Sequence, residues 1–266
     1  MILIALVLLA QDLSQQGAQA MREGRFAEAE RIYRQKAAEA PSEPQWQMNL
    51  GLALHSAGKY AEALREFGRY LKAVPQAGPV HLLAGIDHLK LAAPCRAIGP
   101  LEIARRWQAS KQVLTELADA YSGCNRYSEA AKVLEAAKEP RLAARAHWQA
   151  REYDAAKLLF DAVSAAHAND PEFQYEYGDT IYRVEGAEAA LPHLQLAVSI
   201  LSAKGSLGRA LLDLGRAAEA IPHLEAAVQA DSTLLLPLSR CYKATGRVED
   251  AARVEAEYRK RLGALQ

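Results

Sequence analysis

Two histidines come closest to a chemical site in this chain, because they recur in matching surroundings. His193 follows Leu191-Pro192 and His223 follows Ile221-Pro222, so the two segments look like copies of one structural position. If neighbouring helices carry them, one helix-packing distance of about 10 Å separates the rings. That distance is too long for both imidazoles to bind one metal ion. We therefore predict copied surface positions and no metal site.

Motifs for catalysis or nucleotide binding are missing from the sequence. It contains no phosphate-binding loop ending in Lys-Ser or Lys-Thr, no dinucleotide fingerprint and no His-Glu-x-x-His. Gly205-Ser206-Leu207-Gly208 resembles a glycine loop, but Gly208 also falls on the helix-crossing position of the repeat described below. Most carboxylates lie in Ala-Glu-Ala settings, which suit solvated helix faces better than acid–base catalysis. The sequence predicts no enzyme and no cofactor.

The amino-acid composition indicates the type of secondary structure that would position a functional site. The chain has 266 residues, 32 basic and 32 acidic, and therefore a formal net charge of zero. Binding to phosphates needs a surplus of Lys and Arg, so we expect no nucleic-acid partner. Alanine, the residue with the highest helix propensity, occurs 54 times. An all-α protein is the expected fold class.

The first ten residues differ from the rest. Residues 1–10 form an unbroken apolar run that ends at Gln11-Asp12. The run is too short to cross a bilayer, so we expect no transmembrane span. Its length suits a signal peptide that is cleaved after Ala10, although no basic residue precedes it and Leu8 occupies the position where a small residue is usual. We expect export to the periplasm or the extracellular space. The alternative is a cytoplasmic protein in which this run is a structural helix.

An internal period organises the chain after residue 12. One alanine per unit recurs at steps of 34, 34, 33, 26, 34, 30 and 31 residues. Twelve positions before each alanine stands a second small residue, which allows two helices to cross closely. The alanines are Ala29, Ala63, Ala97, Ala130, Ala156, Ala190, Ala220 and Ala251, and the paired small residues are Gly17, Gly51, Gly85, Ala118, Ala144, Gly178, Gly208 and Ser239.

The second unit shows the pattern most clearly. Trp46, Leu50 and Leu54 have helical spacing, the run Gly58-Lys59-Tyr60-Ala61-Glu62-Ala63 follows, and Pro75 ends the second helix. Glycine suits the turn because it adopts positive φ without steric cost. This combination of glycine, aromatic, alanine and proline resembles the tetratricopeptide repeat, a helix–turn–helix unit of 34 residues. The resemblance extends over residues 12–262. It implies a right-handed α-solenoid of about eight repeats, and we expect this solenoid domain to span residues 11–266.

One departure from the period concerns domain organisation. The step of 26 residues between Ala130 and Ala156 implies a truncated helix that ends near Pro140. A shortened repeat changes the local superhelical rotation, so we predict a bend or flexible point near residues 138–142.

The repeat also brings two cysteines into proximity. In a stacked solenoid the turns of adjacent units are neighbours, and Cys95 and Cys124 occupy such turns. A disulfide between them would need the oxidising compartment that export provides, and the alternative is two free thiols. Cys241 is expected to be a small core residue.

The resemblance implies a binding surface as well. In this family the first helices of successive units line a concave groove that binds peptides or partner helices. Carried over unit by unit, the groove changes from apolar to acidic and aromatic, and then to basic. Its predicted residues are Met48, Asn49, Leu52, Leu82, Leu83, Ile86, Glu116, Asp119, Tyr175, Glu176, Asp179, Tyr182, Arg209 and Arg240.

We therefore expect a non-enzymatic scaffold or adaptor that binds a protein or peptide in this groove. The Lys, Arg and Asn clamp of chaperone-binding family members is absent, because Asn49 is isolated among Ser14, Ala18, Pro79 and Leu83. Two alternatives stay open. The chain is a cytosolic regulatory module with a structural N-terminal helix, or the apolar units two and three pack against a second copy in a homodimer or larger assembly.

Export leads to a test on the protein isolated from its native cells. We expect mass spectrometry to find a mature chain that begins near Gln11, with Cys95 and Cys124 joined in one disulfide-linked peptide pair. A chain that retains Met1-Ile2-Leu3, with both thiols free, would contradict export and the disulfide together.

Overall fold

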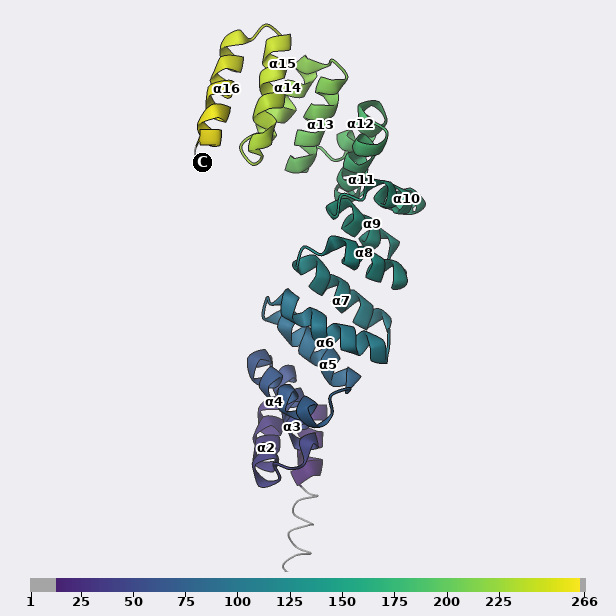
Figure 1. Ribbon diagram of the computed structural model, residues 1–266, viewed down its shortest axis with the longest axis vertical. Helices are drawn as coiled ribbons and strands as arrows, with labels where there is room; N and C mark the ends of the chain where they lie inside the picture. The colour runs from purple at the N-terminus through teal and green to yellow at the C-terminus, as the bar shows by residue number, and fades with distance from the viewer. Residues whose placement is uncertain (1–12, 264–266) are drawn as a thin grey trace, which may run out of the picture. The chain divides into compact units, whose positions relative to one another are not determined.

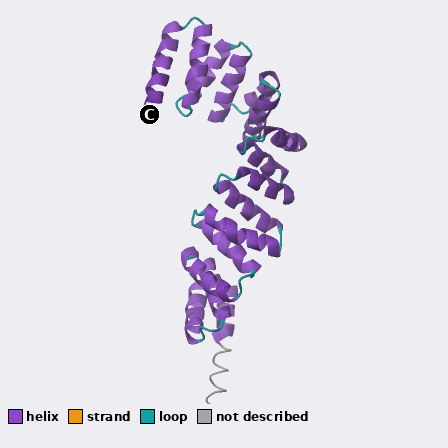
Figure 2. Cartoon of the chain, viewed as in Figure 1, coloured by secondary structure: helices purple, strands orange, loops and turns teal. Residues whose placement is uncertain are grey.

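A computed structural model of the chain describes residues 13–263, and the described part is built from helices without a strand (Figures 1 and 2). Residues 1–10, for which a signal peptide is predicted, lie outside this range. Residues 13–22 are helical. They are followed by α2 (Phe26–Glu39), α3 (Pro44–Ser56), α4 (Tyr60–Ala73), α5 (Gly78–Lys90), α6 (Pro94–Trp107), α7 (Lys111–Gly123), α8 (Tyr127–Ala136), α9 (Pro140–Gln149), α10 (Tyr153–Val163), η1 (Ser164–His167), α11 (Pro171–Val184), α12 (Ala187–Leu196), α13 (Leu201–Asp213), α14 (Ala217–Ala227), η2 (Ser232–Leu234), α15 (Leu235–Ala244) and α16 (Val248–Gly263).

The helices of the described residues form two compact units, which divide between Lys138 and Glu139: residues 13–138 (unit 1) and residues 139–263 (unit 2). In unit 1, helix pairs follow one another as 13–22 with α2, α3 with α4, α5 with α6 and α7 with α8. Unit 2 repeats the arrangement with α9 and α10, α11 and α12, α13 and α14, and α15 and α16. The all-α solenoid of helix–turn–helix repeats predicted from the sequence is confirmed.

Each helix pair is centred on the crossing that the sequence predicted. The repeat alanines, Ala29 and Ala63 among them, are completely or almost completely buried. A Cβ atom added to Gly51 would lie 2.5 Å from Cε1 of Phe67, and one added to Gly208 would lie 2.5 Å from Cγ of Leu224. The small residue of the first helix thus leaves room for a large apolar side chain of the second helix, four positions after the repeat alanine.

The turn inside each repeat requires one residue with positive φ. Glycine fills that position in several repeats, as Gly58 does with a φ of 75°. Ala92 and Arg151 occupy the equivalent place with φ values of 52° and 62°, although a side chain makes this conformation unfavourable by about 1 kcal/mol. The turn therefore persists without glycine because the packing of the two helices determines where the chain reverses.

The short step in the repeat period corresponds to short helices. Helices α8 and α9 have 10 residues each, whereas α4 has 14. Unit 1 ends at Lys138, which has a φ of 59°, and Pro140 occupies the first turn of α9. The division between the units coincides with the short repeat, and the bend near residues 138–142 stays a prediction.

The last repeat replaces apolar packing with polar contacts. At the crossing position Ser239 is buried, and its hydroxyl donates a hydrogen bond of 2.8 Å to Oε1 of Glu255. Lys243 forms an ion pair with the same carboxylate. Glu255 occupies the place of the large apolar residue in other repeats, and a polar outer helix is what the end of a repeat array requires. In the described part of the chain, the longest apolar stretches within helices fall short of a membrane span.

Substitution of Gly51 tests the crossing. We expect Gly51→Ala to lower the free energy of unfolding by about 1–3 kcal/mol, because the new methyl group overlaps the ring of Phe67. The matched control is Gly68→Ala in α4, where the added Cβ meets no atom within 4 Å, so higher helix propensity should raise stability by about 1 kcal/mol. Urea denaturation followed by circular dichroism measures both. Equal effects of the two substitutions would show that the crossing is not tightly packed.

Candidate functional site

The predicted groove residues lie on the first helices of their repeats, α3, α5, α7, α11, α13 and α15. In unit 1 all of them are at least partly exposed, which leaves one accessible stripe along each first helix. Met48, Leu52 and Leu83 also pack against the core cluster of the unit and contribute to its stability. Asn49 is partly exposed beside them. Leu82 and Ile86 on α5 are partly exposed as well.

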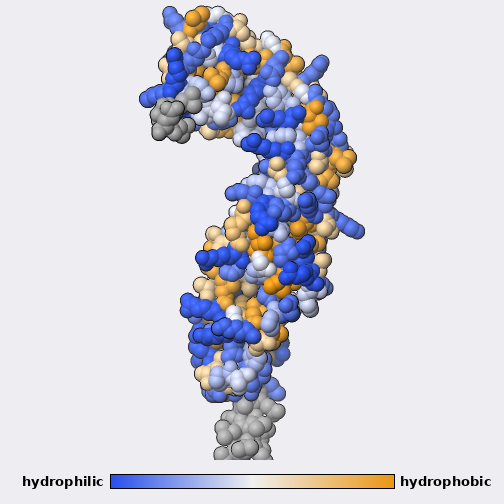
Figure 3. Space-filling view, in the orientation of Figure 1, coloured by the Kyte–Doolittle hydropathy of each residue, from blue (hydrophilic) through white to orange (hydrophobic). Residues whose placement is uncertain are grey.

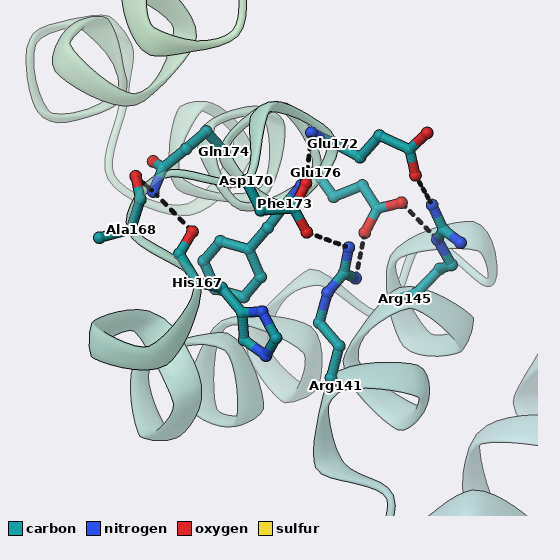
Figure 4. Close-up of polar contacts among 9 residues, drawn as sticks. All are labelled: Arg141, Arg145, His167, Ala168, Asp170, Glu172, Phe173, Gln174 and Glu176. Carbon is teal, nitrogen blue, oxygen red and sulfur yellow. Dashed lines mark hydrogen bonds and ion pairs between the residues drawn. The ribbon is translucent and has the colours of Figure 1, made fainter.

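In unit 2 the two acidic groove residues of α11 are buried. Glu176 is 3% exposed and Asp179 is 7% exposed. Figure 4 shows why the first of these charges is tolerated: Arg141 and Arg145, both on α9, form ion pairs with the two oxygens of Glu176. Arg145 also contacts Glu172 at 3.0 Å. The carboxylate of Glu176 therefore joins two neighbouring first helices, and its role as a partner contact stays a prediction.

Aromatic rings and a helix cap complete this junction (Figure 4). The guanidinium of Arg141 lies 5.1 Å from the ring centroid of Phe173, and the ring of His167 stacks on Phe173 with a centroid distance of 5.1 Å. Asp170 accepts hydrogen bonds from the backbone amides of Glu172 and Phe173, which caps the start of α11. These contacts hold α11 in one orientation against α9.

The carboxylate of Asp179 accepts hydrogen bonds from residues of the two neighbouring repeats. Trp148 Nε1 donates a hydrogen bond of 2.9 Å to one carboxylate oxygen, and the hydroxyl of Ser206 donates one of 3.2 Å to the other. Arg183 is 4.0 Å away. Since a buried carboxylate is costly without such donors, this arrangement fixes the side chain in place.

A small pocket opens beside Asp179, between α11, α13 and the segment that leads to α15. Its volume is about 230 Å³, and predicted groove residues from two repeats meet in it. Tyr175 stands edge-on to Trp148 with a ring-centroid distance of 5.6 Å. Arg209 contacts Asp231 at 3.4 Å and the hydroxyl of Thr233. The remaining lining residues are Arg183, Leu201, Ser202, Gly205, Ser206, Ala227, Ala230 and Leu234.

Like Glu176, the predicted residues Tyr182 and Arg240 of unit 2 lie outside the pocket. The hydroxyl of Tyr182 donates a hydrogen bond to Asp213, and burial together with this carboxylate raises the pKa of Tyr182 to about 12. The phenol is therefore a hydrogen-bond donor at neutral pH. Arg240 is exposed on α15. The two basic residues of the predicted groove therefore lie in different places. Arg209 lines the pocket, whereas Arg240 lies on the exposed surface of the last repeat.

Sequence reasoning missed the contribution of the fifth repeat. Arg141, Arg145 and Trp148 stand at the positions −3, +1 and +4 relative to Ala144. Tyr175, Asp179 and Tyr182 have the same offsets from Gly178. Applying one offset rule to every repeat would have found these residues, together with the opposite charges that neutralise the acidic repeat.

The cysteines lie where the repeat pattern places them. The structure joins Cys95, at the start of α6, to Cys124, which follows α7, and their Cα atoms are 5.3 Å apart. That separation lies within the usual range for a disulfide. Cys241 is buried in α15, and burial raises the pKa of its thiol.

His193 belongs to the packing of unit 2. Its Nδ1 lies 2.7 Å from Oε1 of Gln174, its ring is 4.7 Å from that of Tyr177, and burial lowers the pKa of the imidazole. Within residues 13–263, no three metal-ligating side chains come together. His193 is therefore explained by its contacts with α11.

Comparison with known proteins gives a consistent result. The family profile described as tetratricopeptide repeat matches residues 15–78, 141–205, 198–234 and 206–264. A tetratricopeptide repeat protein of Parabacteroides merdae is similar, with 14% identity and a TM-score of 0.52 over 87% of this chain and 98% of that one. The C-terminal part of a repeat-containing protein of Cytophaga hutchinsonii has 12% identity and a TM-score of 0.58, over 84% and 98% of the two chains. The structure of Naa15/Naa10 bound to HypK-THB has 16% identity and a TM-score of 0.60, over 95% of this chain and 42% of that one. Curated proteins yield no match.

The ion pairs of Glu176 lead to a stability test. We expect Glu176→Gln to lower the free energy of unfolding by about 2 kcal/mol, because two arginines lose their shared counter-charge at a buried position. Glu172→Gln is the matched control: this side chain is 68% exposed and pairs with Arg145, so the loss should be about 0.5 kcal/mol or less. Thermal unfolding at low and high salt measures both, and equal losses would contradict the structural role of Glu176.

Proposed function

Because the chain belongs to the tetratricopeptide repeat family, whose fold is that of a protein-interaction scaffold, we propose that it is a non-enzymatic adaptor. Its partner-binding site lies on the first helices of unit 2 and includes the pocket beside Asp179. The adaptor holds a segment of another protein there. The observation that carries the proposal is the convergence of Tyr175, Asp179 and Arg209, from two repeats, on one pocket.

The size of the pocket favours a protein ligand. Sites for small molecules usually enclose about 300–1,000 Å³, whereas this pocket has about 230 Å³. One or two side chains of a partner would fill it while the rest of the segment lies along the helices. The pocket offers the hydroxyl groups of Ser202 and Ser206, two arginines and an aromatic ring, which together suit a polar segment.

The electrostatics of the pocket favour binding over catalysis. Asp179 accepts hydrogen bonds from Trp148 and Ser206, so its carboxylate is held in an acceptor role. Arg209 is likewise held by Asp231. Groups fixed in this way recognise a ligand with little loss of side-chain freedom on binding, which favours affinity.

We further propose that the protein is exported. The Cys95–Cys124 bond supports this, because disulfides persist in oxidising compartments and are rare in the cytosol. The apolar run at residues 1–10 supplies a segment suited to targeting.

Photo-crosslinking tests the partner site. A photoreactive amino acid is placed at Ser202, on the pocket, and as a control at Gln195, an exposed position of α12. We expect a discrete adduct in native cells from position 202 and none of the same mass from position 195. The adduct should disappear with Arg183→Glu on the pocket, and it should persist with Arg31→Glu on α2, an exposed arginine of unit 1.

Two outcomes would overturn the proposal. Identical adducts from positions 202 and 195 would show that the pocket has no preference for a partner. An adduct with twice the mass of the chain would identify a second copy and favour self-assembly over an adaptor. Circular dichroism of each variant establishes that the fold is retained.

A further inference from the structure

Helix α5 in unit 1 has a buried side and an apolar accessible side. Val80 and Ala84 are 4% and 5% exposed and face the core. Leu82, Ile86 and Leu89 follow one another at intervals of four and three residues, and each is partly exposed. This spacing places the three side chains in one stripe along the helix. The face of unit 1 that Figure 3 shows carries apolar patches among hydrophilic ones.

Contacts on the buried side of α5 fix the position of the stripe. The carboxylate of Asp87 is completely buried and hydrogen-bonded to Nδ1 of His55 on α3. Because this contact and the Gly85–Leu101 crossing fix the rotation of α5, the helix cannot turn to bury the stripe. Leu82, Ile86 and Leu89 therefore stay available to another molecule.

Two carboxylates lie on α7, the next first helix, which contacts α5. Within residues 13–263, the carboxylates of Glu116 and Asp119 form no direct ion pair or side-chain hydrogen bond. Partial burial raises the pKa of both carboxyl groups, and the Asp119 charge raises that of Glu116 further, whereas Lys90 lowers it. Other acidic groups of unit 1 are paired, as Glu66 is with Arg69. Glu116 and Asp119 thus carry negative charge on the helix next to α5, and Lys90 offsets part of that charge at Glu116.

We infer that the stripe of Leu82, Ile86 and Leu89, together with Glu116 and Asp119, docks an amphipathic helix of a partner protein that carries apolar residues on one side and Lys or Arg along its edge. We call this surface the apolar–acidic face. The inference rests on the proposed scaffold function, but it concerns a second surface that is separate from the pocket of unit 2.

The chemistry of the face selects this class of partner. An apolar stripe with helical spacing is complementary to the apolar side of another helix, whose anchors recur at similar intervals. A cation near Glu116 and Asp119 would offset the partial burial of Glu116 and the repulsion between the two carboxylates. An acidic helix would add a third negative charge, and like-charge contacts of this kind suppress wrong partners.

Binding of two synthetic helices tests the inference. The probes are fluorescent peptides of about 18 residues, long enough to form a helix. Both have leucines at the spacing of the stripe. One carries lysines along the edge of the apolar side, and the other carries glutamates there. By fluorescence anisotropy at low salt we expect the lysine peptide to bind about tenfold more tightly than the glutamate peptide, since each exposed charge pair contributes about 0.5–1 kcal/mol.

A charge exchange makes the test specific. The double substitution Glu116→Lys and Asp119→Lys should reverse the preference, so that the glutamate peptide binds more tightly. Glu188→Lys, an exposed position on α12 in unit 2, is the control and should leave the preference unchanged. Ile86→Asp should abolish binding of the lysine peptide, with Leu89→Asp as a second variant if the first one unfolds.

Three results would overturn the inference. These are equal affinity of the wild-type protein for both peptides, a preference unaffected by the charge exchange, or a wild-type dimer in sedimentation that Ile86→Asp converts to a monomer. The last would show that the face binds a second copy. The Arg183→Glu variant separates this surface from the pocket: it should keep the peptide preference even if the pocket has no partner.

Discussion

Close approach of two helices at a residue without a bulky side chain is the constraint on which this structure depends. In the repeats with a glycine at the crossing, the large apolar residue that follows the buried alanine by four positions lies against that glycine, as Phe67 does against Gly51 and Leu101 against Gly85. A larger residue at the glycine would push the helices apart and open a void around the neighbouring side chains. Because the crossing also fixes how far each first helix is rotated, it determines which side chains face the core and which form the accessible stripe.

The same register determines how neighbouring repeats meet. Arg145 follows the crossing residue of its helix by one position and contacts Glu176, which precedes the crossing residue of the next first helix by two. Asp179 and Ser206 stand in the same relation one repeat later. The zero net charge of the chain thus reflects pairing between adjacent helices as well as a balance over the surface. Glu116 and Asp119 differ from Glu176, because no arginine of a neighbouring first helix forms an ion pair with them within residues 13–263.

Groove positions could be predicted from the sequence, but their burial and partners could not. The offsets from Gly178 place Tyr175, Glu176 and Asp179 on α11. They could not show that Glu176 is buried, because its burial depends on Arg141 and Arg145, more than 30 residues away in the sequence. The same limit applies to the pocket: Arg209 and Asp231 contact each other only because the segment before α15 folds back over α13.

The sequence by itself determined the repeat, the helix pairs and the residues at each crossing, because these depend on contacts within about 34 residues that recur eight times with the same spacing. A local pattern that recurs can be recognised in the sequence without a structure. Only the tertiary structure decided which groove charges are buried and neutralised, which are exposed, and where a pocket forms. Those properties depend on the stacking of one repeat on the next, where a single arginine or serine from the neighbour determines whether a carboxylate is satisfied inside the protein.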